Sequence, residues 1–538
     1  MLSNSGLQQI LLVLCAAIFS VQGAIEESDG KYKVYRLSPT DEAHSTALNL
    51  LYNSGEFDFW KEPSAGNKSA EIMITPAQES QFKVFLDSTK IPFQVLVEDL
   101  NALIYEKEGP NNWRSRALRF LGHGKRDAID GDHTFGLIMG EYYSYDEIVS
   151  YMRRIVEALG GKAKMISIGR THEGREIYGI QFGRPADKSR TVTWIDAGIH
   201  AREWTAVHTG IYMLYVVANA LLNGNQPVHQ KISSYLQNND LLIFPCVNPD
   251  GYEYTRTHPE LAEVRFWRKN RSPEICGHLK SGEHRCCRGV DLNRNFDFHF
   301  SGPPFERFTG GASTYPCSEI FHGRNAFSEP ESKAIRDAVL KLGPQRLVAF
   351  ISLHAYSQLV IYPYSNDKTY FPPDIDELKS LAKRAVNAIG QKYGTNYQYG
   401  SGPEIIYAYT GGSADWAKET VGIKYTYTIE LRPTYTSWNG FVLDKAQLIP
   451  TARETLDGMA VMLDAVDQRS PNPHATVAPA KVEFIPAGRS LVNTQSNPPA
   501  TCQDRAPSCM SWIKERPTIC VDARSAMVRE CKRSCSLC

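Results

Sequence analysis

Three side chains of this sequence have the types and spacing of a catalytic metal site. His200 and Glu203 are three positions apart, so an imidazole and a carboxylate can reach one ion from a tight turn. With His354 as a third ligand, a fourth position stays open to water, which is typical of catalytic rather than structural zinc. Zinc lowers the pKa of its bound water to about 7 and so provides a nucleophile. A lone H-x-x-E is common by chance, and a capping or surface histidine is the alternative.

Hydrolysis at such a site also needs a proton carrier and a group that stabilises an oxyanion. Glu430 follows a nearly continuous apolar run, where a carboxylate is costly unless it is paired or functional. Its alternative is an ion pair with Arg432. Arg268 is a cation within the segment 266–269, and spacing alone does not exclude a surface position for it.

The elements that must position these residues predict an α/β sheet. Residues 127–468 alternate apolar runs with helical patterns. Four runs stand out, at 191–199, 240–247, 346–353 and 422–429. Three of them are followed directly by a residue able to do chemistry: His200, His354 and Glu430. Open α/β sheets bind ligands at the carboxyl ends of their strands, so we expect these three residues to meet.

The N-terminal part of the chain reads as a targeting segment followed by a small domain. Residues 1–23 hold a short apolar core followed by small residues, which predicts a signal peptide and export. Residues 24–126 predict a small α+β domain, with strands at 32–37, 70–75 and 93–97 and helices at 40–53 and 78–88. This domain ends in the basic pair Lys125-Arg126. An exposed basic pair favours a protease cut near Arg126, and a plain solvated linker is the alternative.

The C-terminal part contains a linker and a cysteine-rich module. Residues 469–500 are rich in Pro, Ala and small polar residues and predict an extended linker. Residues 501–538 hold six of the 12 cysteines, which indicates a disulfide framework in an oxidising compartment. Cys246, inside an apolar run, is expected to be a buried free thiol.

Composition limits the possible partners. Lys plus Arg and Asp plus Glu both number 59, so no net field favours nucleic acid or an anionic membrane. Beyond the N-terminal core, no apolar run is long enough to predict a membrane span. We therefore expect no nucleic-acid partner and no membrane-spanning segment.

Eight motifs in residues 127–468 resemble, in order, those of the pancreatic-type metallocarboxypeptidases, the carboxypeptidase A/B group. They are GIHAREW (198–204), NPDGY (248–252), FWRKNRS (266–272), GVDLNRNFD (289–297), CSEIFHG (317–323), SLHAYSQ (352–358), IYAYTGGSADW (406–416) and YTIELR (427–432). The resemblance implies an α/β fold whose mixed, mostly parallel central sheet has helices on both faces. It also implies one Zn²⁺ per chain and hydrolysis that releases single residues from peptide or protein C-termini.

Carried over residue by residue, the resemblance implies a role for each catalytic group. His200, Glu203 and His354 would be the zinc ligands. Glu430 would be the general base that activates the water and then protonates the leaving amine. Arg268 would polarise the scissile carbonyl and hold the oxyanion.

The resemblance further implies how the substrate is held. Asn293, Arg294 and Tyr407 would bind its terminal carboxylate, with Arg202 assisting along the groove. A guanidinium fork suits a carboxylate, and such an anchor explains exopeptidase action. Asp291 would accept the second imidazole N–H of His200.

Five positions in the sequence limit which C-terminal residue of a substrate the enzyme is expected to prefer. In the family the side-chain pocket ends near Ala414, where an acid accompanies a basic preference. Because Ala414 is neutral, we expect apolar or aromatic terminal residues. Gly402 and Ser365 should widen the pocket, whereas Tyr409 replaces a usually small residue and should narrow or reshape it. Glu404 is an acid nearby in sequence and leaves a basic preference open.

The flanking segments resemble known modules. Residues 24–126 resemble the family's activation domain, which caps the cleft and keeps the precursor inactive until it is cut. Residues 501–538 resemble a ShK toxin-like domain, for which binding an extracellular partner is the expected role. The expected disulfides are Cys287–Cys317 from the family, a local bridge Cys276–Cys286, and Cys502–Cys538, Cys509–Cys531 and Cys520–Cys535 in the ShK-like module.

Two other functions compete with a carboxypeptidase. A related zinc amidohydrolase that cleaves acyl-amino acids would use the same three ligands, but it predicts neither the activation domain nor the 406–416 motif. A catalytically silent secreted binding protein, acting through the ShK-like module, would be favoured by loss of a ligand or of Glu430. Neither loss occurs in this sequence.

Overall fold

The computed structural model describes residues 29–63, 69–108, 135–222, 226–278, 284–301 and 311–468. We call residues 29–108 the activation segment and residues 135–468 the catalytic part. The expected signal peptide, the cut site near Arg126, the linker 469–500 and the ShK-like module with its three disulfides lie outside the described residues.

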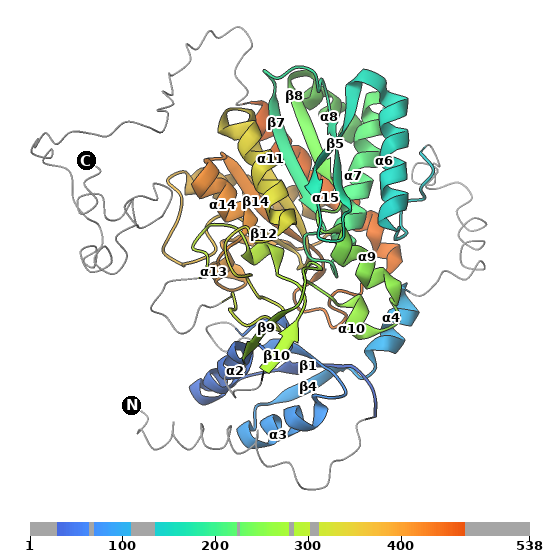
Figure 1. Cartoon of the computed structure of the whole chain (residues 1–538). Coiled ribbons are helices and arrows are strands. Elements are labelled where there is room, and N and C mark those ends of the chain that lie inside the picture. The colour runs from blue at the N-terminus through green and yellow to red at the C-terminus, as the bar shows by residue number, and fades with distance from the viewer. Residues whose placement is uncertain are drawn as a thin grey trace, which may run out of the picture. The chain divides into compact units, whose positions relative to one another are not determined.

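The activation segment is a four-stranded antiparallel sheet with helices (Figure 1). Its elements are β1 (Lys33–Leu37), α2 (Glu42–Ser54), β2 (Asp58–Lys61), β3 (Ala70–Ile74), α3 (Glu79–Thr89), β4 (Phe93–Val97) and α4 (Leu100–Glu108). The strand order is β2-β3-β1-β4. Leu37, Ile72 and Phe82 are fully buried in its core. The three predicted strands and two predicted helices are present, and β2 and α4 are additions that no apolar run had indicated.

The catalytic part is built on an eight-stranded mixed sheet, in the order β13-β12-β14-β11-β7-β8-β6-β5. The strands are β5 (Ala163–Arg170), β6 (Glu176–Phe182), β7 (Thr191–Ala197), β8 (Asn239–Phe244), β11 (Leu347–Ser357), β12 (Leu359–Ile361), β13 (Gln398–Gly400) and β14 (Tyr425–Thr434). The four central strands β14, β11, β7 and β8 pair in parallel. These four contain the four predicted apolar runs.

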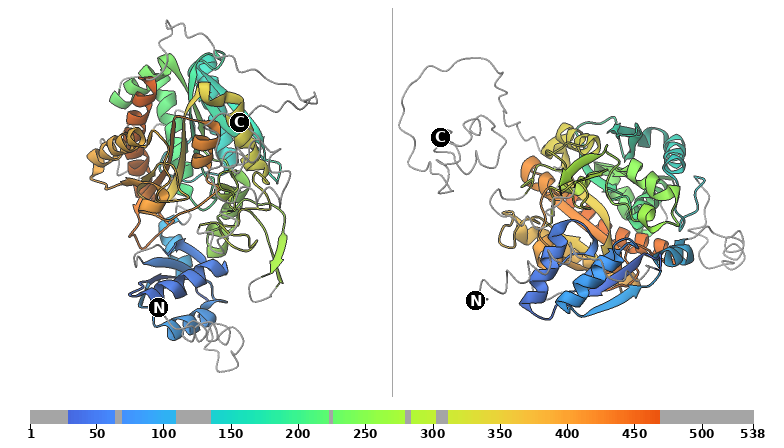
Figure 2. Two further views of the ribbon diagram at one scale, coloured as in Figure 1. Left: turned by 90° about the vertical axis from the view of Figure 1, so that its left-hand side faces the viewer. Right: turned by 60° about the horizontal axis from the view of Figure 1, so that its bottom comes forward.

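Helices cover both faces of this sheet (Figure 2). They are α6 (Tyr145–Leu159), α7 (Trp204–Leu222), α8 (Pro227–Asn238), α9 (Pro249–Thr257), α10 (Ala262–Arg265), α11 (Pro330–Arg346), α12 (Ile375–Tyr393), α13 (Gly402–Ile405), α14 (Ser413–Trp416) and α15 (Leu448–Asp467). Alternate residues of β7 point to opposite faces of the sheet and pack into the hydrophobic core on each face. Val192 and Trp194 face α11, whereas Ile195 and Ala197 face α7 and α15. The predicted fold class is confirmed.

Helix α7 is the most apolar of the described helices. By length and composition alone it could cross a bilayer, but 89% of its apolar window is buried inside the protein. It packs against one face of the sheet and begins at Trp204, directly after Glu203. This burial is typical of a core helix. Because the helix is held in the core, it also fixes the turn that precedes it.

The lengths of the strands decide where the site forms. Strand β7 ends at Ala197, which pairs with Leu353 of β11. Strands β11 and β14 continue past this level and place His354 opposite Glu430. The sequence predicted that these two residues follow their strands; instead they lie within them. Strand β12 flanks β14 on its other side and pairs Leu359 with Glu430, whereas β7 no longer flanks β11 at the level of His354.

Candidate active site

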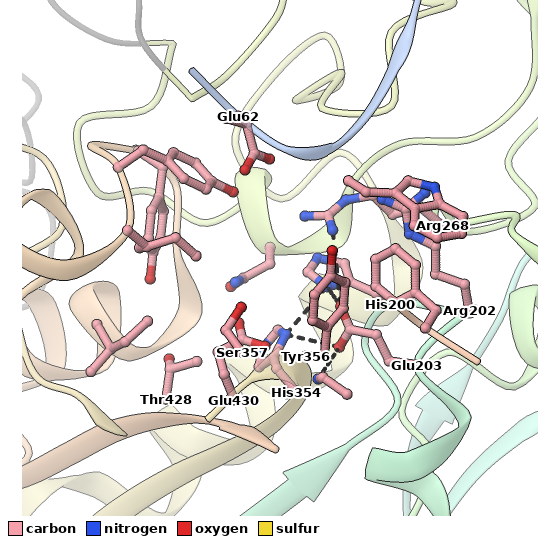
Figure 3. Close-up of a pocket in the computed structure, with 18 of the residues that line it drawn as sticks. Glu62, His200, Arg202, Glu203, Arg268, His354, Tyr356, Ser357, Thr428 and Glu430 are labelled. Atoms are coloured by element: carbon pink, nitrogen blue, oxygen red, sulfur yellow. Dashed lines mark hydrogen bonds and ion pairs between the residues drawn. The ribbon is translucent and has the colours of Figure 1, made fainter. Parts of the chain in front are cut away.

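The three expected metal ligands lie together beyond the carboxyl end of β7 (Figure 3). His200 Nδ1 is 2.6 Å from Glu203 Oε1 and 3.2 Å from His354 Nδ1. His354 Nδ1 is 3.1 Å from Glu203 Oε2. All three side chains are buried. The fold therefore brings ligand atoms from two distant parts of the chain to one point.

Hydrogen bonds fix which nitrogen of each ring carries the proton. His200 Nε2 is 3.0 Å from Asp291 Oδ1, and an ionised carboxylate only accepts, so the N–H points to Asp291. The Ser352 hydroxyl donates to Asp196 Oδ1 at 2.6 Å, so its oxygen accepts from His354 Nε2 at 3.2 Å. Both rings therefore present an unprotonated Nδ1 to the same point.

This donor set fits zinc. Two imidazole lone pairs and a carboxylate aimed at one point repel one another unless a cation lies among them. Nitrogen and carboxylate donors suit zinc, and three protein ligands leave a position for water. Burial alone would raise the pKa of Glu203, but His200 and His354 hold that pKa well below its usual value.

Asp291 links this ligand set to Arg268. The Asp291 carboxylate is fully buried, and its Oδ2 accepts from Arg268 Nε and Nη2, both at 2.9 Å. Burial would raise the pKa of Asp291, but Arg268, His200 and Arg294 lower it well below its usual value. Arg268 Nη1 lies 3.9 Å from Glu203 Oε1. The guanidinium is thus held at the border of the ligand set, where it lines the cavity.

Glu430 faces the same cavity from β14. Burial, with the nearby charge of Glu203, raises the pKa of Glu430 to about 8, against the opposing effect of His354. The alternative pairing with Arg432 is not made, because Arg432 binds both oxygens of Glu454 at 2.8 and 2.5 Å. Glu430 is therefore a partly buried carboxyl group that no described arginine or lysine neutralises by a direct ion pair.

Three further predicted residues form what we call the carboxylate clamp: Asn293, Arg294 and Tyr407. Arg294 Nη2 donates to Tyr407 Oη at 2.9 Å, and Arg294 Nε donates to the Gly311 carbonyl. Asn293 Oδ1 accepts from Ser413 N at 2.9 Å. These bonds hold a guanidinium, an amide and a phenol on one wall of the cavity, a set suited to a carboxylate.

The cavity is lined by nine of the ten predicted metal, catalytic and substrate residues. The exception is Ala414, which is buried in α14 and does not line it. Tyr409 and Thr428 line it instead. Glu404 is also absent from the lining; its Oε2 accepts from Ser401 N at 2.7 Å and Tyr362 Oη at 2.9 Å.

The activation segment enters this cavity through β2 and the residue that follows it. Asp58 and Trp60 lie two positions apart on β2, and Glu62 comes directly after Lys61, the last residue of the strand. Arg202 Nη1 donates to both oxygens of Asp58, at 3.0 and 2.8 Å. The Trp60 ring lies 4.9 Å from the ring of Phe266. Glu62, which sequence reasoning missed, points into the cavity (Figure 3).

Glu62 lies among the groups that would bind a substrate carboxylate. Burial raises its pKa, while Arg268, Arg294 and a hydrogen bond with Tyr407 oppose that rise. Glu62 and Trp60 both line the cavity, so the activation segment takes up part of it. No apolar run predicted β2, so the sequence held no signal for Glu62, and its place follows only from the packing of β2 against the catalytic part.

A second contact anchors the end of the activation segment. Arg265 binds both oxygens of Glu108, at 2.6 and 2.8 Å, and both side chains are buried. The Arg265 guanidinium also lies 3.7 Å from the ring centroid of Trp204 and donates to the carbonyl of Arg202. Helix α4 is thus tied to the turn that carries a metal ligand.

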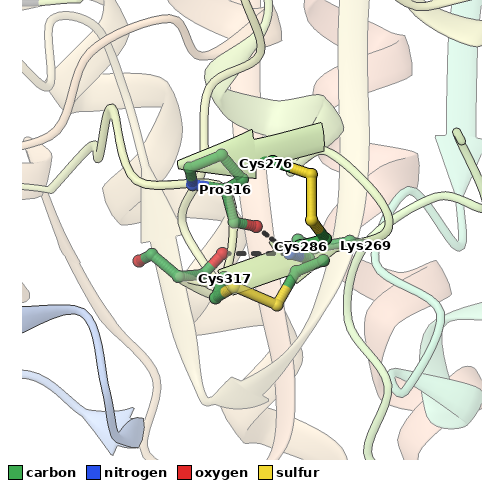
Figure 4. Close-up of a disulfide and its surroundings, with 7 residues drawn as sticks. Lys269, Cys276, Cys286, Pro316 and Cys317 are labelled. Atoms are coloured by element: carbon green, nitrogen blue, oxygen red, sulfur yellow. Dashed lines mark hydrogen bonds between the residues drawn. A yellow bond between two sulfur atoms is a disulfide. The ribbon is translucent and has the colours of Figure 1, made fainter. Parts of the chain in front are cut away.

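Two disulfides hold the loops behind the site (Figure 4). Cys276–Cys286 joins β9 (Ile275–His278) to β10 (His284–Cys287), and Cys287–Cys317 joins β10 to the loop 311–323. Lys269 Nζ donates to the carbonyls of Pro316 and Ser318 in that loop. Cys246 is a buried free thiol. The pairs found are the two expected for the catalytic part.

Comparisons with known proteins agree with this geometry. Residues 148–458 match the family profile of zinc carboxypeptidases, and residues 35–107 match that of carboxypeptidase activation peptides. Mouse carboxypeptidase A2 is 34% identical over 81% of this chain and 93% of its own length. Mouse carboxypeptidase A1 is 34% identical over 85% and 97%. The crystal structure of thrombin activatable fibrinolysis inhibitor has a TM-score of 0.65 and 30% identity, covering 82% of this chain and all of that one.

The clamp predicts a specific requirement for glycine at position 411. Gly411 and Gly394 have nearly the same positive φ, 71° and 69°, but an added Cβ would lie 2.1 Å from the Arg294 carbonyl oxygen at Gly411 and meet nothing within 4 Å at Gly394. Gly394→Ala should cost about 1–2 kcal/mol of unfolding free energy from backbone strain alone. Gly411→Ala should cost about 1–3 kcal/mol more from overpacking, measured by denaturant unfolding. Equal losses would contradict the close approach.

Proposed function

Because this chain belongs to the zinc carboxypeptidase family, we propose that it is a secreted zymogen that hydrolyses the last peptide bond of a polypeptide and releases the C-terminal residue. The observation that carries this proposal is the carboxylate clamp beside a His-Glu-His donor set in one cavity. A metal site alone would suit many hydrolases. The clamp restricts the substrate to chains that end in a free carboxylate.

The family uses one catalytic zinc, and His200, Glu203 and His354 would hold it here. Bound zinc supplies Lewis acidity, which lowers the pKa of a water and polarises a carbonyl. Asp291 orients His200 from behind, and Ser352 does the same for His354.

Glu430 is the proton carrier. Its carboxylate takes a proton from the attacking water as the C–O bond forms at the scissile carbonyl. It then gives that proton to the amine as the C–N bond breaks, so the general base is restored at the end of the cycle. A pKa raised by burial to about 8 suits both steps, because the group can hold and release a proton near neutral pH.

Arg268 stabilises the oxyanion. Its guanidinium is held by Asp291 at 2.9 Å and presents N–H groups to the cavity. Hydrogen bonds placed before the reaction stabilise developing charge without reorganisation. The same hydrogen bonds to Asp291 keep the Arg268 guanidinium from forming a close ion pair with Glu203.

Asn293, Arg294 and Tyr407 receive the terminal carboxylate of the substrate. A carboxylate bound there leaves the preceding peptide bond next to the donor set and Glu430, so single residues are released. Arg202 lines the cavity on the other side and is available to the upstream backbone once Asp58 leaves.

The released residue has an apolar side chain. Ala414 is neutral, and the acid that left a basic preference open, Glu404, is engaged by Ser401 and Tyr362 outside the cavity. Of the acids that do line the cavity, Glu203 and Glu430 have catalytic roles and Glu62 belongs to the activation segment. A cationic terminal side chain would thus lack a partner in the mature enzyme.

The activation segment acts as the inhibitor. Glu62 places a carboxylate where the clamp would bind substrate, Asp58 occupies Arg202, and Trp60 fills the upstream groove beside Phe266. A cut near Arg126 would allow the segment to leave. Export, the activating protease and an extracellular partner for the ShK-like module complete the proposal and rest on sequence alone.

The proposed function is tested with the full chain after limited cleavage between its two parts. Peptides with blocked N-termini should lose one C-terminal residue, peptides with amidated C-termini should not be cut, and a zinc chelator should abolish hydrolysis until zinc is restored. Mass spectrometry of the products gives the readout. Equal cleavage of amidated peptides would contradict the clamp, and hydrolysis only of acyl-amino acids would favour the amidohydrolase.

Replacing Glu430 should separate catalysis from metal binding. Glu430→Gln keeps the size of the side chain but cannot accept the proton, so kcat should fall by about 10²–10⁴-fold. Zinc content, measured by atomic emission, should remain at one per chain. Glu203→Gln should lose both zinc and activity. An active Glu430→Gln variant would remove this residue from the mechanism.

Replacing Glu62 should weaken inhibition in the uncut chain. Glu62→Gln removes the charge that faces Arg268 and Arg294, so the precursor should gain activity by about tenfold, equivalent to roughly 1.4 kcal/mol. Asp87→Asn alters an exposed acid on α3 of the same segment and is the matched control. Activity is measured on uncut protein whose integrity is checked by electrophoresis. Unchanged activity in both variants would assign inhibition to the other contacts.

A further inference from the structure

We propose that Tyr409 sets the depth of the terminal side-chain pocket, so that this enzyme releases residues with small apolar side chains and discriminates against aromatic ones. This inference rests on the proposed function and narrows it. The expectation of aromatic terminal residues came from Ala414, which does not line the cavity. Tyr409 lines it instead.

The place of the terminal side chain follows from the two ends of the cavity. The donor set and Arg268 lie at one end, whereas Thr428 lies on the other side of Glu430 (Figure 3). Ile361 pairs with Thr428 across neighbouring strands, and Ile406 and Tyr409 also line the cavity. A terminal residue bound by its carboxylate must direct its side chain to this end, because the other end holds the scissile bond.

Tyr409 is closely packed where it lies. A Cβ added at Gly412 would be 2.9 Å from Tyr409 Cε2, and one added at Gly311 would be 2.6 Å from Tyr409 Cβ. Both positions are glycine, and any larger residue would collide with this tyrosine. The ring is 94% buried, and the Tyr409 backbone N–H donates to the carbonyl of Ser365 at 2.8 Å. The ring has little room to withdraw.

A cation holds the same ring. The Arg294 guanidinium lies 4.7 Å from the Tyr409 ring centroid, within the range of a cation–π contact. Moving Tyr409 aside would therefore break a contact with the clamp itself. A bulky terminal side chain would have to displace a packed ring, whereas a methyl or isopropyl group would not.

The energetic consequence is a difference between substrates. Discrimination in an apolar pocket arises from differences of a few methylene groups and amounts to about 10–200-fold. We expect kcat/KM for terminal Ala or Val to exceed that for terminal Phe by about tenfold or more. The ratio isolates the pocket, because changes in clamp geometry affect all terminal residues through their shared carboxylate.

The experiment compares blocked peptides that differ only in a terminal Ala, Val, Leu, Phe or Arg, using the full chain after activation. The wild type should favour Ala and Val. Tyr409→Ala should raise the Phe-to-Ala ratio of kcat/KM by about tenfold or more, and Tyr409→Phe, which keeps the ring, should leave it unchanged. Zinc content and thermal unfolding check that each variant is folded.

The outcomes separate the two proposals. A wild type that cleaves terminal Phe as well as Ala overturns the role of Tyr409 even if the variants do not fold, while leaving carboxypeptidase activity established. An unchanged ratio in folded Tyr409→Ala overturns it as well. Failure to cleave any of the five peptides with zinc bound would overturn the proposed function, and the pocket inference with it.

Discussion

The site depends on the hydrogen bonds that the buried Asp291 carboxylate accepts. One oxygen accepts from His200 Nε2 and from the backbone N–H of Asn293, and the other accepts from Arg268. One side chain thus sets the tautomer of a metal ligand, the direction of the oxyanion group and the start of the turn that carries Arg294. A buried carboxylate is tolerated only when such partners compensate its charge. Metal binding, carbonyl polarisation and carboxylate recognition therefore share one electrostatic support.

The sheet and the loops behind it give Asp291 its position. Strand β7 ends before the level of His354, and the two longer strands β11 and β14 carry His354 and Glu430 to the cavity. The Asp291 backbone N–H donates to the carbonyl of Phe321, which lies in the loop tied by the Cys287–Cys317 disulfide. A parallel sheet alone would bring strand ends together. Here the disulfide also limits the movement of the loop that holds Asp291.

Inhibition and specificity use the same groove in different ways. In the activation segment, β2 meets Arg202 through Asp58 and Phe266 through Trp60, and Glu62, directly after the strand, lies beside the clamp. Tyr409 belongs to the catalytic part and remains when the segment leaves. The contacts of the activation segment determine when the cleft is open. Those of Tyr409 determine which terminal residue the open cleft can accept.

The sequence by itself determined the chemistry of the site, because the identities of His200, Glu203, His354 and Glu430 and their places after apolar runs follow from residue type and strand periodicity. It also predicted the α/β class and the separate activation domain. The tertiary structure alone decided that Tyr409 rather than Ala414 lines the cavity and that Glu62 enters it. Pocket depth and cleft occupancy depend on side chains from distant segments packing against one another, and no local pattern encodes which residue of the segment 406–416 will line the cavity.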